Sequence, residues 1–111
     1  NLYAHDIEAA LIGIEGLKPG RAIAFGVDNA VTGTEDLVVA AEMDAGMAEP
    51  EMAALSERIR GHLMQVILAT PREVVVLPPD TLIKTSSGKL SRDENRRRYL
   101  AGALKTWRTT Q

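Results

Sequence analysis

An apolar stripe in the middle of the chain places the strongest constraint on its fold. Its members recur at steps of three and four residues: Met52, Leu55, Ile59, Leu63 and Val66. This spacing predicts a helix over 50–69 with one continuous apolar face. Thr70-Pro71 ends the helix because proline cannot continue it, and the three consecutive valines within 72–77 are typical of a strand buried on both sides. A long helix with a complete apolar face, followed by a buried strand, predicts a helix packed on a sheet.

The residues before this stripe predict a shorter helix and a pair of strands. We expect 1–6 to form a loop that enters a helix ending near Gly13. One face of that helix is apolar at i, i+3, i+4 and i+7, through Ile7, Ala10, Leu11 and Ile14. Lys18-Pro19-Gly20 predicts a turn, after which 21–27 alternates large apolar with small residues, as a half-buried strand does. A polar turn over 28–34 and an apolar run over 35–43 predict its antiparallel partner.

The C-terminal part predicts one more helix. Ser91 and Glu94 form an S-x-x-E capping pattern, which marks the start of a helix from Arg92 to about Leu104. Together the elements predict an α/β (α+β) fold: a compact small domain with an about three-stranded, mainly antiparallel sheet and two to three flanking helices. A length of 111 residues fits one domain with a modest core.

Composition excludes several classes of function. The chain has no cysteine, which rules out disulfides and thiolate metal sites. Its two histidines, His5 and His62, are too few to build a metal site, so we expect none. No apolar run approaches the ~20 residues of a membrane span and no signal peptide is recognisable, so we expect a cytoplasmic protein without a membrane span. A net charge of −2 does not favour nucleic-acid binding.

A loop of small residues near the C-terminus is the best candidate for chemistry. Thr85, Ser86 and Ser87 can bond their own backbone in turns, and Gly88 allows backbone angles that a Cβ atom forbids. Lys89 would then present a mobile positive charge, which suits phosphate or carboxylate oxygens. A Walker A loop is excluded, because Ile83 and Leu90 stand where that motif requires glycine and Ser or Thr. A merely solvated lysine is the competing interpretation.

The string Lys84-Thr85-Ser86-Ser87-Gly88-Lys89-Leu90-Ser91-Arg92, which follows Leu77-Pro78-Pro79-Asp80, resembles the lysine-bearing motif that closes the adenylate-forming enzymes. That superfamily includes acyl-CoA synthetases, fatty acyl-AMP ligases, nonribosomal peptide adenylation domains and luciferases. One departure is visible: Ile83 stands where the family usually has proline, which should alter the stiffness of the loop more than its chemistry.

The resemblance implies a domain and a reaction. Residues 1–111 would be the mobile C-terminal domain of an acyl-adenylate-forming ligase, excised from a longer chain, which a start at Asn1 without methionine fits. A fatty acid would attack the α-phosphate of ATP, with Mg²⁺, to give acyl-adenylate and pyrophosphate, and the acyl group would then pass from the adenylate to the phosphopantetheine thiol of an acyl carrier protein. Lys89 would be the adenylation lysine, supported by Thr85, Ser86, Ser87, Gly88 and Arg92. The expected partner is a large N-terminal domain that binds most of the ATP, so the isolated domain is expected to be inactive.

The first residues carry a second part of the resemblance. Asn1-Leu2-Tyr3-Ala4-His5-Asp6-Ile7-Glu8 is similar to the segment just past the interdomain hinge, in a form closer to the fatty acyl-AMP ligases than to typical CoA synthetases. Ala4 replaces the usual proline. The resemblance implies that Asn1, Leu2, Tyr3 and His5 lie near the phosphopantetheine tunnel. For Tyr3 and His5, ordinary surface packing is the competing interpretation.

Two other functions stay open at this point. The parent enzyme could be an acyl-CoA synthetase that transfers the acyl group to CoA. Alternatively, the chain could be a non-enzymatic binding module that uses the basic helix from Arg92 to Arg98 on nucleic acid, although the negative net charge and the lack of an aromatic stacking platform speak against it. The same basic helix is also explained as a solvated face, or as a contact for an acidic carrier protein.

Overall fold

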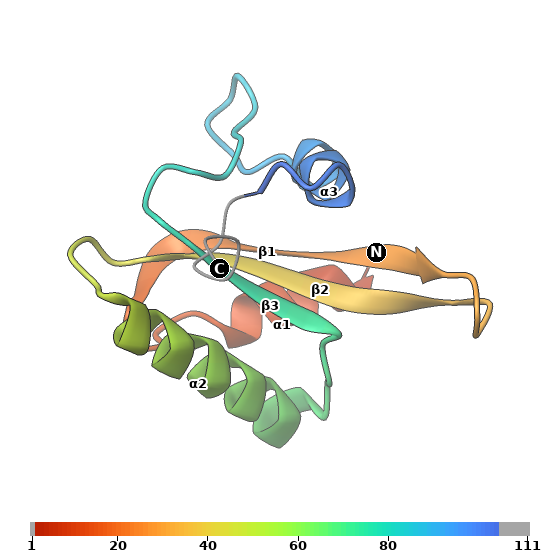
Figure 1. Ribbon diagram of the computed structural model, residues 1–111, viewed down its shortest axis with the longest axis horizontal. Helices are drawn as coiled ribbons and strands as arrows, with labels where there is room; N and C mark the ends of the chain where they lie inside the picture. Colours follow the sequence, from red (N-terminus) through yellow and green to blue (C-terminus); the bar gives the residue numbers. More distant parts are fainter. Residues whose placement is uncertain (1, 105–111) are drawn as a thin grey trace.

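The computed structural model describes residues 2–104, which form a three-stranded mixed sheet with helices on both faces (Figure 1). The strand order is β1-β2-β3, with β1 and β2 antiparallel and β2 and β3 parallel. The compact α+β fold expected from the sequence is confirmed. The elements are α1 (Leu2–Ala10), β1 (Leu17–Asn29), β2 (Thr34–Met43), α2 (Glu49–Ile67), β3 (Glu73–Leu77) and α3 (Arg92–Leu100).

The two faces of the sheet carry separate hydrophobic clusters, because successive side chains of a strand point to opposite faces. In Figure 1, α1 and α2 lie below the sheet, whereas α3 and the chain that leads to it lie above. Val74 and Val76 face the cluster shared with α1 and α2, and Val75 faces the cluster beneath α3. All three valines are buried, as their run predicted. The β2-α2-β3 connection therefore covers one face and leaves the other to α3.

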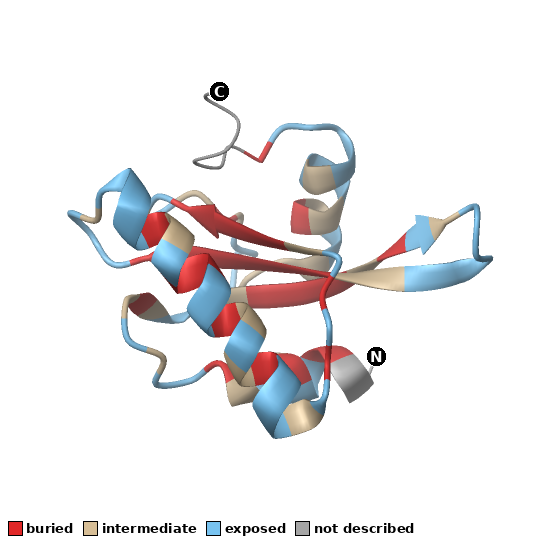
Figure 2. Cartoon of the chain, turned by 60° about the horizontal axis from the view of Figure 1, so that its bottom comes forward, coloured by how far each residue is buried: buried red, intermediate tan, exposed pale blue. Residues whose placement is uncertain are grey.

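Helix α2 follows the predicted apolar stripe for most of its length. Four of its five members are buried against the sheet: Met52, Leu55, Ile59 and Leu63. Figure 2 shows this buried side of α2 turned inward and the exposed side turned to solvent. The assignment of Val66 to the stripe is wrong, because its side chain is 55% exposed and Ile67 packs on the cluster instead. No helix in the described part of the chain is both long and apolar enough to cross a membrane.

The N-terminal helix begins earlier than expected. The sequence favoured a loop over 1–6, but α1 already starts at Leu2. Ala4 is the physical reason, since it is buried on the same cluster as Ile7 and Leu11 and so extends the apolar face by one turn. The expected loop is therefore helical over its described residues.

Two other boundaries also differ. Lys18-Pro19-Gly20 is not a turn ahead of the strand but part of an irregularity inside β1, where the register jumps from Leu17↔Met43 to Ala22↔Ala41. Gly20 has φ +72°, which glycine adopts without strain. The last helix ends at Leu100 rather than near Leu104, because Gly102 takes a left-handed conformation (φ +73°) directly after the C-cap residue Ala101. Leu104 then buries its side chain in the cluster beneath α3.

The burial of α2 leads to a stability prediction. Ile59→Ala should lower the free energy of unfolding by about 2–5 kcal/mol, because Ile59 is fully buried and a cavity would remain. Val31→Ala, in the loop between β1 and β2, is the matched control: Val31 is 95% exposed, so a change within about 0.5 kcal/mol is expected. Urea unfolding followed by circular dichroism measures both. Equal effects of the two substitutions would contradict the assignment of the core.

Candidate functional site

The lysine loop, residues 84–90, is a small closed turn. Lys84 and Leu90 form an isolated antiparallel bridge at its base. The amide of Thr85 donates to the carbonyl oxygen of Lys89 (2.7 Å), and the amide of Gly88 donates to that of Thr85 (2.9 Å). Gly88 has φ +88°, a conformation that strains any residue with a Cβ atom. Glycine is therefore required immediately before Lys89 by the shape of the turn.

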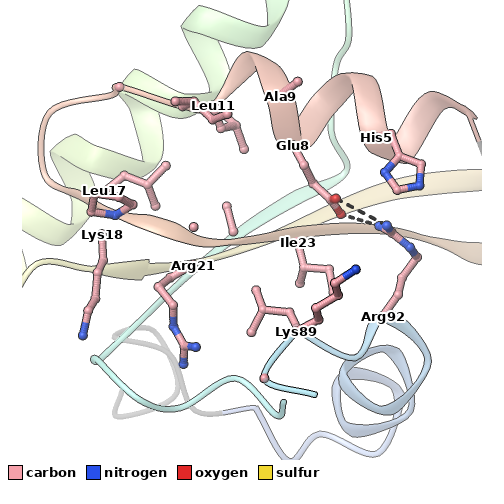
Figure 3. A pocket seen from close by; sticks show the side chains of 17 residues that line it. His5, Glu8, Ala9, Leu11, Leu17, Lys18, Arg21, Ile23, Lys89 and Arg92 are labelled. Carbon is pink, nitrogen blue, oxygen red and sulfur yellow. Dashed lines mark hydrogen bonds and ion pairs between the residues drawn. The ribbon is translucent and has the colours of Figure 1, made fainter. Parts of the chain in front are cut away.

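The side chains of the lysine loop are exposed from Lys84 to Lys89. The hydroxyls of Thr85 and Ser87 lie 2.9 Å apart and hydrogen-bond each other at the tip. In Figure 3 the side chain of Lys89 reaches from the loop toward β1 and α1, on the side where Glu8 and Arg92 meet. The tip of the loop is thus not packed inside the domain, and its amine is accessible to a neighbour.

A groove of about 550 Å³ runs between the lysine loop, α1 and the irregular part of β1. Lys89 lines it from the loop, His5 and Glu8 from α1, and Lys18 and Arg21 from β1 (Figure 3). The structure therefore brings His5 and Lys89, two of the residues singled out from the sequence, to one groove. His5 is exposed there.

The other residues expected near the phosphopantetheine tunnel are less informative. The backbone of Leu2 and Tyr3 belongs to the first turn of α1. Asn1 lies outside the described residues.

Arg92 ties the end of the lysine loop to α1 and β1. Its guanidinium pairs with the carboxylate of Glu8, with one contact at 3.3 Å, and donates to the carbonyl oxygen of Ala24 (2.6 Å). The same Glu8 carboxylate accepts from the amide of Ala24 (2.9 Å). Arg92 thus touches the body of the domain rather than the tip of the loop, a geometry that suits a supporting role.

A buried carboxylate holds the segment ahead of the lysine loop. Glu42, fully buried at the end of β2, accepts two hydrogen bonds of 2.7 Å from Arg21. Its oxygens also accept from three consecutive amides, those of Asp80 (3.0 Å), Thr81 (2.9 Å) and Leu82 (2.8 Å). Burial raises the pKa of the Glu42 carboxyl, but the Arg21 guanidinium and the backbone amides outweigh this, so its pKa lies below the ordinary value. Glu42 is therefore ionised at neutral pH.

The side-chain amide of Asn95 holds the next residue of this segment, Ile83. Asn95 lies near the start of α3 and is fully buried. Its Oδ1 accepts from the amide of Ile83 (2.9 Å), and its Nδ2 donates to the carbonyl oxygens of Ile83 (3.1 Å) and Ser91 (2.7 Å). Asn95 thus contacts both residues that flank the lysine loop.

Sequence reasoning missed Glu42 and Asn95. A signal existed for Glu42: it lies at an i+2 step from Ala40 on the apolar run of β2, so the strand period places a charge on a buried face, where it needs a partner. Asn95 gave no comparable signal, because a polar residue on a polar helix is expected to be solvated.

Helix α3 begins where the capping pattern predicts, with the serine as the cap and the glutamate carboxylate engaged with an arginine of the helix. The hydroxyl of Ser91 accepts from the amide of Glu94 (3.2 Å). The Glu94 carboxylate pairs with Arg97, whose guanidinium also lies 3.1 Å from Asp93. This pairing holds the pKa of the Glu94 carboxyl below its usual range.

The arginines of α3 do not form one open basic face. Arg92 and Arg96 point onto β1, where Arg96 donates to the carbonyl oxygen of Gly26 (2.7 Å). Arg97 pairs with the acidic residues of its own helix. This arrangement does not favour a nucleic-acid surface. Within 2–104 no group of three or more His, Cys, Asp or Glu side chains could hold a metal ion.

Comparisons with known proteins show which proteins share the sequence and fold of this chain. No model of a protein family matches the chain. Among curated proteins, "Putative ligase Rv1013" of Mycobacterium tuberculosis is 37% identical over 92 residues, which cover 83% of this chain and 17% of that protein. The chain therefore spans about a sixth of the curated relative that it matches.

Solved structures of the same class share the fold. An A-PCP structure of McyG complexed with phenylalanyl-adenylate matches 89% of this chain and 18% of its own, with 25% identity and a TM-score of 0.79. The fatty acid AMP ligase from Legionella pneumophila matches 95% of this chain and 18% of its own (22% identity, TM-score 0.74). An acyl-CoA synthetase from Brucella canis matches 89% and 17% (25% identity, TM-score 0.70).

These matches confirm the resemblance to the adenylate-forming enzymes. The fold and the lysine loop define a chain similar to the small C-terminal domain of that class, and its curated relative is a ligase by name. The fatty acyl-AMP ligases are one group among the solved structures, alongside the A-PCP structure of McyG and an acyl-CoA synthetase.

The buried Glu42 predicts a pH dependence of stability. Because the pKa of Glu42 is lowered in the folded state, its stabilising effect is complete above the ordinary value of about 4.5 and is lost as the pH falls toward the lowered value. Glu42→Gln should cost about 3 kcal/mol or more at pH 7, since it leaves Arg21 buried without its partner charge. The difference from the unsubstituted protein should shrink below about pH 4.5. Urea unfolding from pH 7 to pH 3 measures it, and a difference that grows on acidification would contradict the assignment.

Proposed function

We propose that this chain is the C-terminal domain of a fatty acyl-AMP ligase. The full-length enzyme would activate a fatty acid with ATP and Mg²⁺ and transfer it to the phosphopantetheine thiol of an acyl carrier protein. The observation that carries the proposal is the placement of Lys89: an accessible amine on a short turn, with both ends of the turn attached to buried groups.

The chemistry of the first step needs such an amine. In-line attack at the α-phosphate spreads negative charge over oxygens between the carboxylate and the leaving pyrophosphate. A lysine that reaches those oxygens only when the domains close lowers the energy of the transition state more than that of the ground state. A preorganised donor of this kind contributes about 3–4 kcal/mol, a rate factor of roughly a hundred to a thousand.

The second step needs the amine elsewhere. The thiol must approach the adenylate, and rotation of the small domain would withdraw Lys89 and bring another surface forward. His5 lies on α1, and the start of the chain resembles the segment that follows the interdomain hinge in the adenylate-forming enzymes. This supports a position near the incoming phosphopantetheine for the first residues of the chain. The large N-terminal domain is the partner in both steps.

Loss of the amine should separate the two half-reactions. In the full-length enzyme, Lys89→Ala should lower the rate of adenylation by about a hundredfold to a thousandfold, because the transition-state charge loses its donor. Thioester formation from supplied acyl-adenylate should be almost unchanged. Pyrophosphate exchange measures the first step, and transfer to holo carrier protein measures the second.

Lys84→Ala is the matched control, since Lys84 is also exposed but lies at the base of the loop. It should cost much less than Lys89→Ala. Equal losses in both half-reactions for Lys89→Ala would argue against its proposed role.

The acceptor can be tested by competition. The full-length enzyme that contains this chain, given a labelled fatty acid, ATP and Mg²⁺, should load holo carrier protein and leave CoA largely unused. Chromatography of the labelled products separates the two outcomes. Predominant acyl-CoA would instead assign the enzyme to the acyl-CoA synthetases, with the role of Lys89 unchanged.

A further inference from the structure

The segment that delivers the lysine loop is held by side chains in an unusual way. Four consecutive backbone amides, those of residues 80–83, donate to only two side chains, Glu42 and Asn95. Both side chains are fully buried. Short connections more often satisfy their amides with backbone partners or water. Here two distant elements, the end of β2 and the start of α3, supply the acceptors.

Asn95 acts on both ends of the loop at once. Its amide group brackets Ile83, accepting from the amide and donating to the carbonyl oxygen, and it also donates to the carbonyl oxygen of Ser91. The amide of Ser91 donates to the carbonyl oxygen of Ile83 as well (2.9 Å). Ile83, Ser91 and Asn95 therefore form a closed set of contacts, which we call the Asn95 clamp. The span 84–90 leaves and returns through it.

We propose that Asn95 is a positioning residue for Lys89, which acts by fixing the two ends of the lysine loop. This inference rests on the proposed adenylation function. Asn95 is fully buried on α3, so it touches no substrate, and its effect reaches the reaction only through the loop. A displacement of about 1 Å in a reacting group can cost about a hundredfold in rate, so the definition of the loop ends bears directly on Lys89.

Because residue 83 is isoleucine and not proline, its backbone amide needs a hydrogen-bond acceptor. Proline would fix φ at this position and has no amide to satisfy. Ile83 leaves φ free and adds a donor in a half-buried place. The Oδ1 atom of Asn95 accepts from that amide, and its Nδ2 atom donates to the carbonyl oxygen of the same residue, so Asn95 restrains the backbone of Ile83 on both sides. Asn95 thus supplies from α3 the restraint that a proline ring would supply from within the chain.

The test uses the full-length enzyme with two readouts. Asn95→Ala should lower the adenylation rate about tenfold to a hundredfold and leave transfer from supplied acyl-adenylate within about twofold. Hydrogen exchange in peptides spanning 83–91 should become about tenfold faster. If Asn95→Ala does not fold, Asn95→Leu, which preserves most of the volume, replaces it.

Tyr99→Phe is the matched control. It also removes a hydrogen bond from α3, that of the Tyr99 hydroxyl to Glu73 (2.5 Å), but leaves the loop ends untouched. It should change neither the adenylation rate nor the exchange over 83–91. An equal loss of adenylation in Tyr99→Phe and Asn95→Ala would overturn the proposal, since it would reflect a general effect on α3. Equal loss of both half-reactions in Asn95→Ala would also overturn it.

A second substitution should rescue the first. Ile83→Pro in the Asn95→Ala background removes the unpaired donor and fixes φ, so adenylation should recover at least threefold. No recovery would overturn the assignment of the effect to Ile83. The exchange readout keeps the two proposals apart: faster exchange over 83–91, in an enzyme that Lys89→Ala does not impair, would retain the clamp and reject the adenylation role.

Discussion

The carboxylate of Glu42 is the constraint on which the end of the domain that carries the lysine loop depends. It is fully buried, pairs with Arg21 through two hydrogen bonds, and accepts from three successive amides beyond β3. A buried carboxylate is stable only when its lone pairs are satisfied, so the path of the chain after β3 is specified by where those oxygens lie. The Glu42 carboxylate therefore sets the backbone path of residues 80–82, which lead to the lysine loop.

The rest of the site extends the same principle to successive elements. Asn95 takes over from Glu42 at Ile83, and Arg92 attaches the far end of the loop to Glu8 and Ala24. The lysine loop itself contributes little beyond its turn and Gly88. The two ends of the loop are therefore held by residues of β2, α3 and α1, which pack together around the sheet.

Much of this arrangement could be predicted from the sequence, and the remainder has a common physical cause. The stripe of α2, the alternation of β1 and the valines of β3 are periodic patterns set by burial, and they gave the fold. The string from Lys84 to Arg92 is a local motif, and it gave the candidate lysine. The strand period of β2 indicates that Glu42 is buried, but no local pattern identifies the partners of Glu42 and Asn95, which lie about 40 and 12 residues away.

The pairing of Glu8 with Arg92 joins residues 84 positions apart, near the two ends of the described chain. It fastens the first helix to the start of the last one, with the strand β1 between them. Because Arg92 follows the lysine loop directly, this pair attaches the far end of the loop to α1 as well as to β1. Both ends of the loop are therefore held by the body of the domain, and only the turn between them, residues 84–90, lies outside these attachments.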